Sequence, residues 1–97
     1  MMHIRIVDLA GKKAENKDVA RDLRERDILP TLAAGGTVTI DFSGVTDATQ
    51  SFVHALISEA IRKHGDGLQG RLVFRSCCDT VRDMIEFVAG YMQNGEV

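Results

Sequence analysis

Three strand-like segments are each followed by a helix-like segment, and this alternation constrains the fold of the 97-residue chain more than any other feature. The strand-like segments are His3 to about Leu9, 37–42 and 71–76, and the helix-like segments are about 18–34, 50–64 and 79 onward. The predicted order is βαβαβα, which is typical of a mainly parallel or mixed sheet packed with helices. No linker or internal repeat divides the sequence, so we expect one small α/β domain over residues 1–97.

The first predicted helix contains a proline in its interior. Asn16 or Asp18 is placed to cap its start, and the glycine pair at 35–36 is placed to end it. Pro30 lacks a backbone N–H and its ring crowds the preceding turn. We therefore expect this helix to kink or restart near Asp27.

The predicted helix at 50–64 has an apolar stripe and an opposite polar face. The stripe consists of Phe52, Val53, Leu56, Ile57, Ala60 and Ile61. The polar face, which we expect to be exposed to solvent, carries Ser51, His54, Ser58 and Arg62. This face is a candidate surface for contact with another protein.

Charge and apolar content exclude several classes of protein. The formal net charge of −2 gives no attraction to nucleic acid or to an anionic membrane. No apolar run has the length of a transmembrane helix, and the first residues lack the layout of a signal peptide. The only cysteines, Cys77 and Cys78, are adjacent, and their Cα atoms, about 3.8 Å apart, are too close for a comfortable disulfide. We expect a cytoplasmic protein with two buried free thiols.

A polar loop at 43–51 joins the second predicted strand to the second predicted helix. In an open parallel sheet, ligands bind beyond the carboxyl ends of the strands, where this loop lies. We expect Ser51 to cap the helix, at a position where backbone N–H groups also favour a phosphoryl group. Asp41, at the end of the strand, is expected to hydrogen-bond nearby backbone. Capping, partner binding and phosphorylation all remain open for this loop.

An enzyme or a metal site is not favoured. Ser51 and His54 would be neighbours on one helical face, like a nucleophile and a base, but no nucleophile elbow, oxyanion loop or third member accompanies them. His54 and His64 would be about 15 Å apart along the helix and cannot share one ion. We predict no catalytic residue, no metal and no cofactor.

The segment "IDFSGVTDATQSFVHALI" (40–57) resembles the STAS domain of anti-sigma factor antagonists and sulfate transporters. It looks closest to the STAS-like bacterial domains of uncharacterised function. Residues 41–45 match the end of the core strand of that family. The family's Asp-Ser-Ser-Gly positions fall on Thr49, Gln50, Ser51 and Phe52.

The resemblance implies a non-enzymatic signalling module that binds a partner protein, such as a serine kinase of the GHKL type. In that family, phosphorylation of the first motif serine breaks the contact. That position is Gln50 here, which cannot accept phosphate, so Ser51 is the candidate phosphoacceptor. The residues that we expect at the partner-binding surface, through the loop and the following helix, are Asp41, Ser43, Thr46, Asp47, Thr49, Gln50, Ser51, His54, Ser58 and Arg62.

Two alternatives belong to other functional classes. A three-stranded sheet has two exposed edges, so the chain is also a candidate structural or antitoxin-like subunit of a homo- or hetero-oligomer, such as a homodimer. A hydrolase that uses Ser51 and His54 is a remote alternative.

Overall fold

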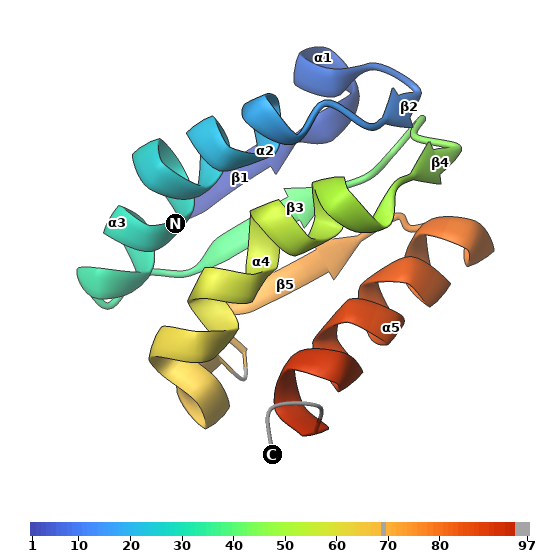
Figure 1. The fold of residues 1–97 in the computed structure, drawn as a ribbon. Helices are drawn as coiled ribbons and strands as arrows, with labels where there is room; N and C mark the ends of the chain where they lie inside the picture. Colours follow the sequence, from blue (N-terminus) through green and yellow to red (C-terminus); the bar gives the residue numbers. More distant parts are fainter. Residues whose placement is uncertain (69, 95–97) are drawn as a thin grey trace.

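The computed structural model describes residues 1–68 and 70–94 and contains a three-stranded sheet in the order β1-β3-β5 (Figure 1). β1 (Met2–Arg5), β3 (Val38–Asp41) and β5 (Leu72–Arg75) all run parallel. Their register aligns Ile4 with Ile40 and Phe74. The predicted α/β fold with a parallel sheet is confirmed.

Three helical units cover one face of this sheet. The remaining elements are α1 (Ile6–Ala10), β2 (Lys13–Ala14), α2 (Lys17–Leu23), a π-helical segment η1 (Arg24–Ile28), α3 (Leu29–Ala33), β4 (Asp47–Ala48), α4 (Gln50–His64), a 3-10 turn η2 (Gly65–Leu68) and α5 (Asp79–Asn94). In Figure 1, α4 lies between the α2–α3 unit and α5, and all of them stand in front of the sheet. No helix in the described ranges, 1–68 and 70–94, is long and apolar enough to cross a membrane.

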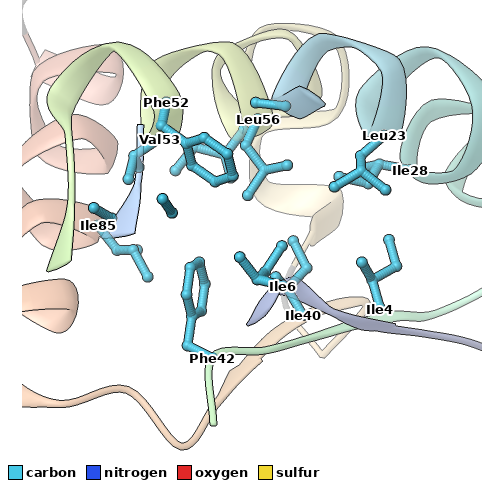
Figure 2. Close-up of a cluster of buried hydrophobic side chains, with 14 of the residues drawn as sticks. Ile4, Ile6, Leu23, Ile28, Ile40, Phe42, Phe52, Val53, Leu56 and Ile85 are labelled. Carbon is cyan, nitrogen blue, oxygen red and sulfur yellow. The ribbon is translucent and has the colours of Figure 1, made fainter. Parts of the chain in front are cut away.

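The hydrophobic core lies between the sheet and the helices. Side chains on one face of the sheet, among them Ile4, Ile40 and Phe42, point toward Leu56 and Phe52 of α4 (Figure 2). On the opposite face, the His3 and Arg5 side chains of the edge strand β1 are 51% and 53% exposed, whereas Thr39 of the central strand is only 7% exposed. Strand alternation thus turns one side of β1 toward the core and the other side toward solvent.

The first strand is shorter than predicted. It ends at Arg5, and residues 6–10 form the short helix α1, which stops at Gly11 with φ of +78°. The prediction of a strand to about Leu9 is wrong because Ile6, Val7 and Ala10, which pack on the core, also have helical spacing. A segment of five residues fits the period of a strand or of a helix, so packing against the core decides which of the two forms.

The interrupted first helix is confirmed, and the interruption is π-helical. Asn16 caps α2 by accepting a hydrogen bond from the Asp18 N–H over 2.9 Å. In η1, the N–H of Leu29 bonds to the carbonyl of Arg24, five residues back, rather than four. Pro30, directly after it, has no N–H to continue the normal pattern.

The cysteine prediction is partly wrong. Both thiols are free, but Cys77 is only half-buried and Cys78 is exposed. The two residues lie in the connection between β5 and α5, where Cys77 packs against the core and Cys78 is left open to solvent.

Phe42 and Phe87 provide a matched test of this packing. Phe42 is fully buried and Phe87 is 57% exposed. We expect Phe42→Ala to lower the free energy of unfolding by about 3–5 kcal/mol, since it removes a buried ring and leaves a cavity. Phe87→Ala is expected to change it by about 0.5 kcal/mol or less. Urea denaturation followed by circular dichroism measures both, and equal losses would contradict the assigned core.

Candidate functional site

The carboxyl ends of the three long strands meet at one edge of the sheet because the strands are parallel. The loop after β3 runs along this edge through β4 and enters α4 at Gln50. The loop after β5 lies beside it, since Cys78 Sγ is 3.6 Å from the carbonyl oxygens of Val45 and Thr46. We call residues 41–54, with their contacts, the strand-end site.

Main-chain hydrogen bonds to residues 12–14 fix the loop of the strand-end site. The N–H groups of Thr46 and Asp47 donate to the Lys12 carbonyl over 2.8 and 3.3 Å. The Thr49 N–H donates to the Ala14 carbonyl over 3.0 Å, and β2 pairs in parallel with β4. The Thr46 hydroxyl also donates to the Lys12 carbonyl over 3.3 Å. The loop is therefore held by a second small ladder, which sequence analysis missed because two-residue strands have no readable period.

Thr49, rather than Ser51, caps α4. The Thr49 hydroxyl accepts a hydrogen bond from the Phe52 N–H over 3.1 Å, and Thr49 has the extended backbone of a cap residue. Ser51 is the second residue inside the helix and is exposed. The prediction that Ser51 is the cap is wrong, because α4 begins at Gln50, as its predicted bounds require, and the cap position therefore falls on Thr49, whose N–H is held by the Ala14 carbonyl. The Ser51 hydroxyl is consequently not used as the cap.

Asp41 shapes the turn that leaves β3, as expected for a carboxylate at the end of a strand. Its Oδ1 accepts a hydrogen bond from the Ser43 N–H over 2.9 Å, and its Oδ2 lies 3.2 Å from Nε2 of His3. The Ser43 bond, and after it the His3 bond, hold the pKa of Asp41 below its ordinary value. The sequence pattern did not connect His3 to the site, because His3 lies 38 positions from Asp41 and only the β1–β3 register brings the two close.

Cys77 is a poor candidate for a nucleophile. Burial raises the pKa of the Cys77 thiol, and the neighbouring Cys78 raises it further. The Cys78 thiol instead donates weak hydrogen bonds to the loop carbonyls of Val45 and Thr46. Cys78 therefore contacts the loop of the strand-end site from the side opposite the β2–β4 ladder.

The start of α4 presents three exposed side chains, Gln50, Ser51 and His54. With Lys17 of α2 and Ala55, they line an open depression of about 440 Å³. The first turn of α4 contains no acidic residue, so no carboxylate within that turn offsets the positive end of the helix dipole. Together with Lys17, this gives the depression a preference for anionic groups.

Two residues predicted at the partner-binding surface lie elsewhere. Ser58 is only 4% exposed, so the prediction that it faces solvent is wrong. α4 packs between α2 and α5 (Figure 1). A larger part of its circumference is therefore buried than in a helix that packs against the core on one side only. Arg62 is exposed but lies about 16 Å along the helix from Ser51 and pairs with Glu59 over 2.8 Å.

The strand-end site therefore gathers eight of the predicted residues. They are Asp41, Ser43, Thr46, Asp47, Thr49, Gln50, Ser51 and His54. Within the part of the chain that the structure describes, no group of three or more His, Cys, Asp and Glu side chains is placed to hold a metal ion.

Comparison with known proteins supplies the family. The model of the STAS-like domain of unknown function (DUF4325) matches residues 19–82. The chain belongs to this family of STAS-like domains. The match extends from α2 into α5 and includes β3, the loop of the strand-end site and α4. No curated protein and no solved structure matches the chain.

The cap of α4 in this STAS-like domain can be tested with two substitutions of one kind. Thr49→Ala is expected to lower the free energy of unfolding by about 1 kcal/mol, because it leaves the Phe52 N–H without its acceptor. Ser51→Ala is expected to change it by about 0.5 kcal/mol or less, since the exposed hydroxyl is not a cap. Thermal and urea unfolding measure the difference, and a larger loss in Ser51→Ala would contradict the assignment.

Asp41 links the stability of the STAS-like domain to acid pH. Because its folded pKa lies below the ordinary value of 3.8, its stabilising effect is present above that value and is lost as the pH falls through the folded pKa. We expect Asp41→Asn to remove this acid-dependent part of the stability. His3→Ala should raise the pKa of Asp41 only partway, since the Ser43 bond remains. NMR titration of the carboxylate tests this, and a wild-type pKa at or above 3.8 would contradict it.

Proposed function

We propose that this STAS-like domain is a non-enzymatic regulatory module that binds a partner protein through the strand-end site. The observation that carries the proposal is a loop fixed from both sides that leaves Gln50, Ser51 and His54 exposed at the start of α4. A surface that is already ordered loses little conformational entropy on binding. The residues that hold the loop are distinct from those available for recognition.

The shape of the depression favours a protein partner over a small substrate. It is open and shallow, whereas sites for small molecules are concave and enclose most of the ligand. Lys17 and the start of α4 favour an acidic group on the partner. From the family resemblance, we propose a kinase of the GHKL type as the partner.

Ser51 is the residue through which such an interaction would be switched. Its hydroxyl is exposed and is free of the capping role, which Thr49 fills. A phosphoryl group on Ser51 would lie at the N-terminal turn of α4 and near Lys17, where the domain tolerates negative charge. It would also reverse the charge that the depression offers to an acidic partner. Binding and phosphorylation would therefore oppose each other.

The hydrolase alternative receives less support. Within residues 1–68 and 70–94, no hydrogen bond joins the Ser51 hydroxyl to the His54 ring, and both side chains are exposed. A nucleophile and base need contact with each other and an orienting third group.

We also propose a cytoplasmic location for the protein. The free thiols of Cys77 and Cys78 support a reducing compartment such as the cytoplasm.

A charge placed at Ser51 tests the proposal. We expect Ser51→Asp to weaken capture of the partner from cells that express the protein naturally, by about tenfold or more, because it adds negative charge to the recognition surface. Thr80→Asp is the matched control, since Thr80 is exposed and is also the second residue of its helix, α5. Quantitative mass spectrometry of the captured proteins, and of phosphate on the bait, provides the measurement.

Equal capture by wild-type protein and Ser51→Asp would exclude the start of α4 from the interface. Equal weakening by Thr80→Asp would show that added charge acts through the whole domain rather than through this site. Circular dichroism of both variants establishes that each is folded.

A further inference from the structure

We propose that β1 is a docking strand for a second copy of this chain, with two β1 strands paired antiparallel across a two-fold axis. The two sheets would then form one continuous sheet with both helical layers on the same side. This interface is separate from the strand-end site and does not depend on the function proposed for it.

The outer edge of β1 offers unpaired backbone groups. Met2 donates its N–H to the Thr37 carbonyl over 2.8 Å, and the register pairs Met2 with Val38 and Ile4 with Ile40. Backbone groups of successive residues in a strand point to opposite sides, so those of His3 and Arg5 face away from β3. The Arg5 carbonyl, at the N-cap of α1, accepts the first hydrogen bond of that helix, so the N–H and carbonyl of His3 and the N–H of Arg5 are the groups left for another strand. β1 is the last strand in the order β1-β3-β5, and no other described strand pairs with this edge. An edge of this kind is a template for another strand.

A groove runs along this edge. One depression of about 290 Å³ is lined by all four residues of β1 and by Leu9, Leu23 and Asp27. A second one, of about 310 Å³, shares these last three residues and extends along α2 and η1. Leu9 is an apolar side chain with 52% exposure. A paired strand would cover Leu9 while its backbone bonds to His3 and Arg5.

The charges along the groove favour a second copy of the chain over a peptide whose charges all have the same sign. Its rim carries acidic and basic side chains together, namely Arg5, Asp8, Asp22, Arg26 and Asp27. A two-fold axis places such a mixed patch against itself, so that basic groups of one copy can face acidic groups of the other. A uniformly acidic or basic segment would meet repulsion from one part of the rim.

The alternation of β1 also fits pairing with itself. Met2 and Ile4 lie on the face that packs against the helices, and His3 and Arg5 lie on the open face. Directly opposed residues in an antiparallel pair share a face, so the permitted registers place His3 opposite either His3 or Arg5 of the second copy. The register with His3 opposite His3 is favoured, because it uses the free N–H and carbonyl of His3 and the N–H of Arg5, whereas the Arg5 carbonyl accepts the first hydrogen bond of α1. The apolar layer then continues from one copy to the other.

The oligomeric state, with one matched pair of variants, tests the proposal. We expect the wild-type protein to sediment as a dimer with twice the 10.7 kDa mass of the chain. Leu9→Lys should raise the dissociation constant by about tenfold or more, because it replaces an apolar side chain in the interface with a charged one that must lose its hydration there. Phe87→Lys is the control, since Phe87 is also an exposed apolar residue but lies on α5. A monomer at about 1 mM, or a dimer weakened by Phe87→Lys and not by Leu9→Lys, would overturn the proposal.

Two backbone measurements test strand pairing directly. His3→Pro removes an N–H that does not serve the β1–β3 ladder, so we expect a folded monomer, whereas His3→Ala should stay dimeric. In the wild-type dimer, the amide protons of His3 and Arg5 should exchange slowly with solvent. Fast exchange of both amides in a dimer would overturn the strand-pairing model even if His3→Pro does not fold.

Discussion

The parallel pairing of β3 with strands on both of its edges is the constraint on which the rest of the structure depends. Val38 and Ile40 are aligned with residues of β1 and of β5 in the same register. Parallel neighbours cannot be joined by tight hairpins, so the chain must cross over the sheet between strands. The crossovers cover one face with helices, and they bring all three carboxyl ends to one edge (Figure 1). The position of the strand-end site follows from this pairing.

At that edge, structural and recognition roles are divided among neighbouring residues. Asp41 shapes the turn, Thr46 bonds to Lys12, and Thr49 caps α4. In the sequence these polar side chains look like candidates for a binding or catalytic site. In the structure they mainly form hydrogen bonds that fix the backbone of the loop. Ser51, two residues beyond the cap, is left exposed on a rigid support. A fixed loop that presents a few uncommitted side chains suits recognition better than catalysis, which requires groups that contact one another.

The same thin sheet that creates the site leaves backbone groups available at its margins. β3 uses its hydrogen-bonding groups on both sides, whereas in β1 the N–H and carbonyl of His3 face away from β3. A small domain with three strands cannot close its sheet, so each outer strand must be covered, charged or paired. At β1, mixed charges and Leu9 border a groove rather than block it. With partner binding at the strand-end site and dimerisation along the outer edge of β1, two copies of the domain would present two recognition surfaces in one dimer.

The sequence by itself determined the order of the three sheet strands and of the longer helices that follow them, the bounds of α4, the interruption near Pro30 and the family. These depend on local periodicity, on proline geometry and on a contiguous motif. It also placed most of the strand-end site on one loop. Only the tertiary structure decided that Thr49 is the cap, that Ser58 is buried between flanking helices, and that His3 reaches Asp41. Each of these outcomes depends on contacts between segments far apart in the chain. Local residue patterns carry no record of such contacts, so they become fixed only when the sheet register and the helix packing are formed.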